Sequence, residues 1–241
     1  MRISKEGYVT IAIVSALILS AFVLLLLFQN GIVLYSSMIP LLAVEALILY
    51  FFRDPERKIP QDDNVIISPA DGRVVLIQPV HENKFLKEES VQISIFLSVF
   101  NVHVNRIPVS GVVKYFEYMN GKFLAAFRDT ASSQNEQTII GIQSPHCKIL
   151  FKQIAGLLAR RIVCNAREND RVVKGERFGI IKFGSRVDVI VPKNVEIKLK
   201  VGDRVIGGES IIGIIHTNTA GGDNGFNASS ISKSVKEKAE V

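Results

Sequence analysis

The hydrophobic positions of this chain follow two different patterns, one before and one after residue 58. Residues 9–28 form an uncharged run rich in Leu, Ile and Val, and residues 32–52 form a second apolar run. A run of about 20 apolar residues has the length that crosses a bilayer as a helix. The uncharged turn Gln29-Asn30-Gly31 separates the runs. The pattern predicts a membrane anchor at residues 1–58, built as a transmembrane hairpin of two helices.

The second run departs from a uniform apolar helix at two positions. Pro40 removes a backbone donor and is expected to kink the helix, and Glu45 is costly inside lipid. A single span followed by an interfacial segment broken at Pro40 is therefore an alternative to two spans. A cleaved signal peptide is disfavoured, because the first run is long and no small-residue cleavage site follows it.

Basic residues stand at both outer ends of the predicted hairpin, while its tip carries no charge. They are Arg2, Lys5, Arg53, Arg57 and Lys58. Since positive residues stay on the cytoplasmic side, both ends of the hairpin are predicted to face the cytoplasm. The rest of the chain is then expected at the cytoplasmic surface of the cell membrane.

After residue 58 the pattern changes to short β-branched runs separated by turns, which is typical of strands. The predicted strands cover residues 64–67, 73–78, 91–97, 112–118, 138–142, 148–153, 161–165, 177–182, 187–191, 196–200 and 210–216. Many short strands at this spacing predict a mainly β domain at 59–216, with a sandwich or barrel-like core and few short helices. Residues 217–241 are rich in Asn, Gly and Ser and then in Lys and Glu, which indicates a flexible tail.

Charge and cysteine content narrow the possible partners. The 241 residues carry a net charge of +6, which favours an anionic partner. A membrane surface is preferred to nucleic acid, because the chain contains an apolar anchor and no nucleic-acid motif. Cys147 and Cys164 form no CxxC or zinc-binding pattern, so we expect no metal site and free thiols.

The peptide Gly184-Ser185 is the first candidate for chemistry. Glycine leaves the bond open to close approach, and a serine hydroxyl can attack the preceding carbonyl and shift the acyl group from N to O. Elimination then cuts the chain and leaves a pyruvoyl group at position 185. On the dipeptide alone, a bend or bulge before the strand 187–191 is the commoner interpretation.

The surrounding motifs favour the chemical interpretation. They are FGSRVDV at 183–189 followed by Pro192, FFRDPER at 51–57, SPADG at 68–72, NVHVNR at 101–106, GKF at 121–123, Asn135-Glu136, and QIAG at 153–156 leading into ARRI at 159–162. Together, and in this order, they resemble the short phosphatidylserine decarboxylases over residues 51–216. Archaetidylserine decarboxylase is a close variant of that family.

The resemblance implies a membrane-associated lyase made as a zymogen. Autocatalytic cleavage between Gly184 and Ser185 would give a β chain, 1–184, and an α chain, 185–241, that stay together as a heterodimer. The covalent pyruvoyl group derived from Ser185 would be the cofactor, forming a Schiff base with a serine phospholipid. Carbon dioxide would leave, and phosphatidylserine would become phosphatidylethanolamine, a step of phospholipid biosynthesis that needs no metal.

The resemblance also assigns roles to Asp71 and His103. Asp71 would belong to a charge relay that assists Ser185, whereas its Asp-Gly context alone predicts a hairpin turn. His103 matches the histidine implicated in decarboxylation. The family's longer members have a second histidine where this chain has Arg106, and a guanidinium is no ordinary base. Either His103 serves both steps or another group, such as His216, deprotonates Ser185.

Two alternatives remain open from the sequence. The same chemistry on archaetidylserine fits the same residues, because nothing in the chain distinguishes ester from ether lipid tails. A membrane-tethered β-rich adaptor without catalysis is the other alternative. It would suit the anchor and the segment 201–209, which has the appearance of a carrier-domain β-turn-β element without its carrier lysine.

Overall fold

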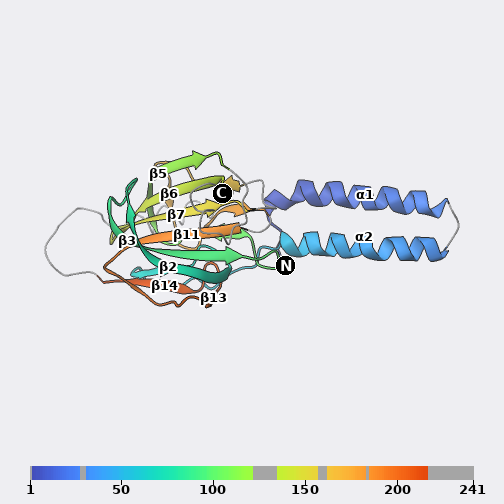
Figure 1. Ribbon diagram of the computed structural model, residues 1–241. Helices are drawn as coiled ribbons and strands as arrows, with labels where there is room; N and C mark the ends of the chain where they lie inside the picture. Colours follow the sequence, from blue (N-terminus) through green and yellow to red (C-terminus); the bar gives the residue numbers. More distant parts are fainter. Residues whose placement is uncertain (1, 28–30, 122–134, 157–161, 183–184, 217–241) are drawn as a thin grey trace.

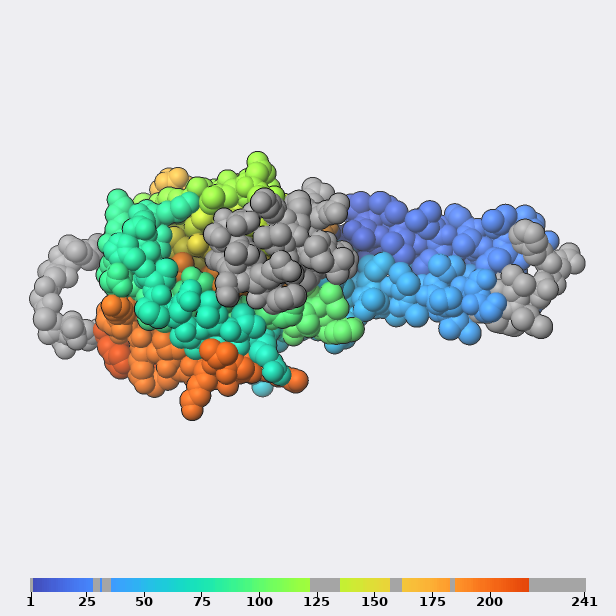
Figure 2. Space-filling view, viewed as in Figure 1, coloured from blue at the N-terminus to red at the C-terminus, as the bar shows by residue number. Residues whose placement is uncertain are grey.

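Two long helices project from a β domain (Figure 1). The computed structural model describes residues 2–27, 31–121, 135–156, 162–182 and 185–216. Helices α1 (Tyr8–Leu26) and α2 (Gly31–Phe51) lie side by side and antiparallel, and the strands follow α2. In the space-filling view the helix pair extends as a narrow rod from the rounded β domain (Figure 2). The mainly β class with two N-terminal helices is confirmed.

The helices differ in how clearly they qualify as membrane spans. The segment Lys5–Leu26, which is α1 with the short 3-10 turn η1 (Lys5–Gly7) before it, is long and apolar enough to cross a membrane, with a mean hydropathy of 2.8. In α2 the described apolar stretch is the shorter Ser36–Phe51. The helix continues through Pro40. One possible span is therefore supported where the sequence predicted two.

The base of the helix pair is joined to the β domain by main-chain bonds. The Ser4 amide donates to the Phe52 carbonyl and the Asp54 amide donates to the Arg2 carbonyl, each at 2.8 Å. Phe51 and Phe52 are buried there with Val102, Val104 and Ile180. We call this set of five residues the neck cluster. Because it contains residues from α2 and from the β domain, the helices are packed onto the domain rather than tethered by a loose linker.

The β domain is built on one large sheet and two small ones. The eight-stranded sheet has the order β13-β2-β3-β11-β7-β6-β5-β9, and the small sheets have the orders β1-β14-β12 and β4-β10-β8. All pairs are antiparallel. The strands are β1 Val65–Ile67, β2 Gly72–Glu82, β3 Glu88–Leu97, β4 Val104–Arg106, β5 Gly111–Met119, β6 Gln137–Gln143, β7 Lys148–Ile154, β8 Ile162–Cys164, β9 Arg171–Val172, β10 Arg177–Ile181, β11 Ser185–Pro192, β12 Val195–Ile197, β13 Arg204–Val205 and β14 Ile211–Ile215.

The core lies on one face of the large sheet, between it and the small sheets. Side chains alternate between the faces of a strand, and Val187, Val189 and Val191 of β11 join the main apolar cluster. Phe151 of β7 is opposite Val189 and packs edge-on against Phe178 of β10. The small β4-β10-β8 sheet therefore covers the face of the large sheet to which Ser185 belongs.

The strand predictions differ from the structure mainly in the shortest elements. β4 and β9 have three and two residues and were not predicted, because so few residues show no periodicity. β13 lies within 201–209, where a β-turn-β element was expected. The strand expected at 196–200 ends at Ile197. Within the described residues of the predicted domain 59–216, every regular element is a strand, so the few short helices expected there are not seen. The tail 217–241 lies outside the described residues.

Candidate active site

Ser185 is the first residue of β11, the strand at the centre of the large sheet. It is opposite Leu97 of β3, and the next residue of β11 is opposite Ile154 of β7. Every residue of the strand is buried, and hydrogen-bonded neighbours flank it on both sides. The Ser185 side chain is fully buried, and its Oγ has no hydrogen-bond partner among the described residues. Gly184, the other half of the candidate peptide, lies outside them.

His103 is carried to the same end of the sheet by a tight turn. β3 ends at Leu97, and the Ser98 amide donates 2.9 Å to the Asn101 side-chain oxygen, which closes the turn. Val104, the residue after His103, is opposite Ile180 of β10. His103 thus lies close to the end of β10, the last strand before Ser185 along the chain. It also follows β3, the strand that pairs with Ser185.

The surroundings of His103 determine which nitrogen is available. Its Nδ1 lies 2.9 Å from the Asn101 carbonyl oxygen, which can only accept a hydrogen bond. Nδ1 therefore carries the proton, and Nε2 is left with a free lone pair. Nε2 is buried without a partner in the described structure. The local geometry thus makes Nε2 a base.

A phenyl ring from the helical region lies against His103. The ring of Phe51, the last residue of α2, is 4.1 Å from the imidazole between centroids and tilted by 33°. Burial, together with the positive charge of Arg53, lowers the pKa of His103 to about 4, against the smaller opposing effect of its hydrogen bond to Asn101. The imidazole is therefore neutral at physiological pH.

Two buried amides accompany the serine and the histidine. The Gln153 Nε2 on β7 donates 2.9 Å to the Asn105 Oδ1 on β4, and both side chains are fully buried. The Asn105 Nδ2 and the Gln153 Oε1 have no partner among the described residues. Both residues lie in motifs noted in the sequence. Their contact could not be predicted from it, because they are 48 positions apart and meet only through the packing of β4 against β7.

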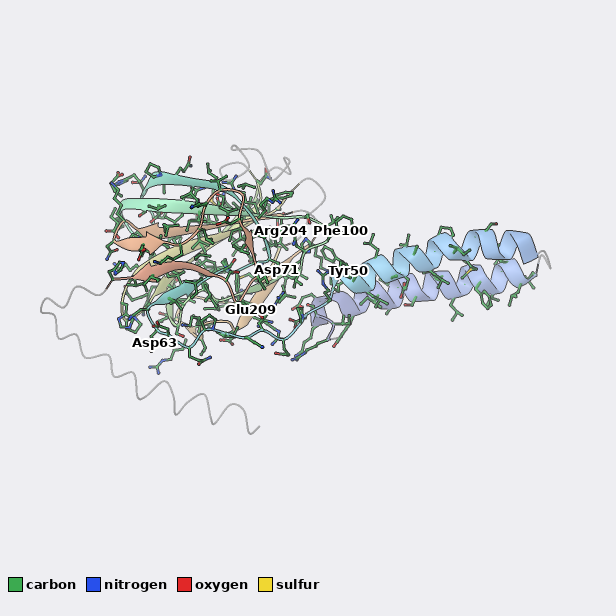
Figure 3. The ribbon with its side chains drawn as sticks, turned by 90° about the horizontal axis from the view of Figure 1, so that it is seen from below. Tyr50, Asp63, Asp71, Phe100, Arg204 and Glu209 are labelled. Atoms are coloured by element: carbon green, nitrogen blue, oxygen red, sulfur yellow. The ribbon has the colours of Figure 1, made fainter. Side chains whose placement is uncertain are left out.

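Asp71 lies in the loop before β2 and forms a different contact from the one predicted. Both of its oxygens are 2.9 Å from Nη2 of Arg57, and its Oδ1 also accepts a 2.7 Å bond from the Gly207 amide. Figure 3 places Asp71 in the part of the β domain nearer the helices, as it does Phe100. The described contacts of Asp71 and of His103 do not join the two residues, so the charge relay stays a prediction.

Arg106, the residue in place of a second histidine, is a structural cation. It donates 2.9 Å to the Gly175 carbonyl and 2.9 Å to the Pro55 carbonyl, and lies 3.4 Å from Asp54. His216, the other candidate base, is exposed and lies 3.1 Å from Glu196 of β12. The structure thus gives Arg106 a role in attaching the segment after α2.

The opposite face of β11 carries a second polar cluster. Arg186 Nε donates 2.6 Å to Asp188, and its Nη2 donates 2.7 Å to Ser94. Gln92 donates to Asp188 at 3.2 Å and to Ser94 at 3.1 Å. We call these four buried residues the clamp network. It attaches the first residues of β11 to β3, on the face opposite Ser185.

The described residues fit a prosthetic group made from Ser185 itself. Such a group needs a buried, unpaired hydroxyl and a neutral base, and the orphaned Ser185 Oγ and His103 Nε2 meet both needs. No group of three or more His, Cys, Asp or Glu side chains that could hold a metal ion occurs in the part of the chain that the structure describes.

Comparison with known proteins agrees with this geometry. The family model described as phosphatidylserine decarboxylase matches residues 44–213. The phosphatidylserine decarboxylase proenzyme of Chlorobium phaeobacteroides (strain DSM 266 / SMG 266 / 2430) is 52% identical over 171 residues, 71% of this chain and 80% of the relative. That of Cytophaga hutchinsonii is 45% identical over 215 residues, 88% and 98%. This chain therefore belongs to the phosphatidylserine decarboxylase proenzyme family.

Proposed function

We propose that this chain is a membrane-anchored proenzyme that cuts itself between Gly184 and Ser185 and then decarboxylates phosphatidylserine. The enzyme class follows from the family: a phosphatidylserine decarboxylase converts phosphatidylserine to phosphatidylethanolamine. The observation that carries the proposal for this chain is the buried Ser185 hydroxyl without a partner, at the head of a central strand and within the family's processing motif.

Self-cleavage requires a nucleophile and a base from the chain. His103 Nε2 takes the proton of the Ser185 hydroxyl, and Oγ attacks the Gly184 carbonyl carbon. The C–N bond breaks, which leaves an ester and a free amine at residue 185. Loss of the Cα proton then expels the Gly184 carboxylate and forms dehydroalanine. Its imine tautomer takes up water and releases ammonia, so that residue 185 becomes pyruvoyl.

Strand pairing explains how the two products stay together. Cleavage at this bond puts β11, β12, β13 and β14 into the α chain, 185–241, and leaves the earlier strands in the β chain, 1–184. β11 pairs with β3 and β7, β13 pairs with β2, and β14 pairs with β1. The α chain would therefore contribute four strands to sheets that it shares with the β chain, as a heterodimer.

In the mature enzyme the residues around position 185 have defined tasks. The pyruvoyl group supplies a keto carbonyl that reacts with the substrate amine and withdraws electrons as carbon dioxide leaves. His103 then delivers a proton to the substrate carbon that has lost the carboxylate. Because its pKa is lowered to about 4, His103 is neutral in the free enzyme. The proton that it delivers would be one that Nε2 has first taken from the substrate ammonium group, which must lose it to become a nucleophile.

Asp71 has a supporting part in this proposal. The relay role implied by the family would have Asp71 assist self-cleavage, whereas the contact with Arg57 points to holding the segment after α2 against β2. Replacing Asp71 with Asn separates these roles. Slow or absent self-cleavage of a folded Asp71→Asn protein would support the relay role, and normal self-cleavage would contradict it.

We also propose that both helices enter the membrane, with the β domain in the cytoplasm. α2 has 21 residues, or about 31 Å at 1.5 Å per residue, which matches a bilayer core. Ser15 of α1 donates 2.5 Å to Glu45 of α2, which gives the costly carboxyl group a partner inside the pair. Residues 1–58 would then form the anchor, 59–216 the catalytic domain, and 217–241 a tail. The site would face the surface where the lipid substrate lies.

The test combines intact-mass measurement with a lipid assay on the detergent-purified chain and on Ser185→Ala. We expect the wild type to give two chains separating after Gly184, the smaller beginning with pyruvoyl, and to release carbon dioxide from phosphatidylserine. Ser185→Ala should stay whole and inactive. An uncut, folded wild type would favour the non-catalytic adaptor. Cleavage with turnover of archaetidylserine alone would identify the ether-lipid variant.

A further inference from the structure

The buried amide pair Asn105–Gln153 has an unused donor and an unused acceptor beside the reacting serine. Val187 is directly opposite Gln153 across β11 and β7, so Ser185, two residues earlier on the same face, is its diagonal neighbour at about 7–8 Å. The pair is joined by a single hydrogen bond, which leaves the Asn105 Nδ2 and the Gln153 Oε1 unpartnered among the described residues. Exchanging O and N in both amides would still leave one donor and one acceptor.

The fold makes room for this pair. Gly179 of β10 is opposite Asn105 in the small sheet. A Cβ atom at Gly179 would lie 3.1 Å from the Gln153 Nε2, so the amide packs directly over the glycine backbone. Fully buried polar atoms without partners are rare in folded proteins because each costs free energy. Two of them, held against a glycine beside Ser185, indicate a site that a ligand completes.

The surroundings of the pair specify the chemistry of that ligand. Among the described residues, no charged side chain exchanges a hydrogen bond with either amide. Val187 and Leu97 on the same face are apolar and fully buried. A neutral donor and a neutral acceptor side by side match a carbon that bears both a carboxylate and an amine. The serine headgroup has such a carbon, and ethanolamine lacks the carboxylate.

We propose that Asn105 and Gln153 form the subsite for the amino acid end of the lipid headgroup, with Asn105 donating to the carboxylate and Gln153 accepting from the amine. This assignment rests on the proposed function and adds substrate recognition to it. A neutral amide binds the carboxylate without the strong ground-state stabilisation that a cation would give, and stabilising the ground state alone does not speed its loss. Once carbon dioxide has left, the Asn105 donor loses its acceptor, which favours product release.

The test uses the double variant Asn105→Leu/Gln153→Met, which replaces both partners with apolar groups of similar shape and leaves no orphan. Self-cleavage is followed by intact mass. Headgroup binding is measured by calorimetry with dihexanoyl phosphatidylserine and dihexanoyl phosphatidylethanolamine. The cleaved protein is first reduced with borohydride, which converts the keto group to an alcohol and prevents turnover. Gln92→Leu is the matched control, since it removes a buried amide from the opposite face of the same sheet.

We expect the double variant to cleave as the wild type does and to lose roughly 10- to 100-fold in affinity for the serine lipid, the size of a hydrogen bond to a charged group. Its affinity for the ethanolamine lipid should change much less, and Gln92→Leu should keep the wild-type preference. An unchanged preference, or equal loss for both lipids, would overturn the subsite. So would loss of self-cleavage in the folded variant, which would assign the amides to processing. Failure of the wild type itself to cleave or decarboxylate would instead reject the proposed function.

Discussion

The two faces of β11 carry buried polar residues in opposite states of hydrogen bonding. On the outer face, Arg186 and Asp188 bond to each other and to Ser94 and Gln92. On the inner face, Ser185 Oγ has no partner within the described structure, and the same is true of His103 Nε2 in the turn between β3 and β4. A satisfied buried network makes the core rigid and specific. A buried polar group without a partner costs free energy, and a catalytic or binding role is one reason for a fold to keep it. The comparison therefore separates residues that hold the strand from residues that we propose to react.

The largest expected effect falls on the inner face. His103→Ala removes the proposed proton carrier, and general acid–base catalysis contributes about 10²- to 10⁴-fold to rate. Self-cleavage, followed by intact mass, should slow by about that factor, and decarboxylation by whatever protein has cleaved, measured by carbon dioxide release, should fall as well. His216→Ala is the matched control, because His216 is exposed just after the end of β14, and it should retain full activity. Equal behaviour of the two variants would contradict the role of His103.

The next effect concerns the outer face. Asp188→Ala leaves Arg186 buried without its ion partner, and breaking a buried pair from one side costs about 3–5 kcal/mol. The free energy of unfolding of the uncut Ser185→Ala protein, measured in denaturant with and without Asp188→Ala, should fall by this amount. Arg186→Met/Asp188→Leu should be much less destabilised, because no lone charge remains. A similar loss in both variants would mean that packing, and not charge, determines the stability of this face.

A smaller effect is the loss of folding stability at low pH that follows from the buried imidazole of His103. His103 has a folded-state pKa of about 4, below an unfolded value of about 6.5, so the unfolded chain binds the proton first. Stability should therefore decline as the pH falls from about 6.5 to about 4, by about 3 kcal/mol in all, and this component should be flat outside that window. Measuring unfolding against pH for Ser185→Ala with and without His103→Gln isolates this component. Parallel curves would show that His103 titrates normally.

Much of the architecture could be predicted from the sequence, because it rests on local patterns. The apolar run at α1 and the β-branched runs of β2, β3, β5 and β11 have lengths and compositions typical of their elements. The short strands β4 and β9 could not be predicted, since only pairing with distant partners makes them strands. The second span was predicted from composition, whereas the described apolar stretch of α2, Ser36–Phe51, is shorter than a membrane span.

The candidate site divides in the same way. The sequence by itself determined the candidates for chemistry: Ser185 after a glycine, and His103 and Asp71 within motifs of one family. The tertiary structure decided their partners, because hydrogen bonds between distant segments depend on strand register and on how the sheets pack. It bonds Asp71 to Arg57, places Phe51 against His103, and brings the Asn105–Gln153 pair together beside Ser185. A sequence can specify reactive groups locally, but which of them remain unsatisfied is a property of the assembled core.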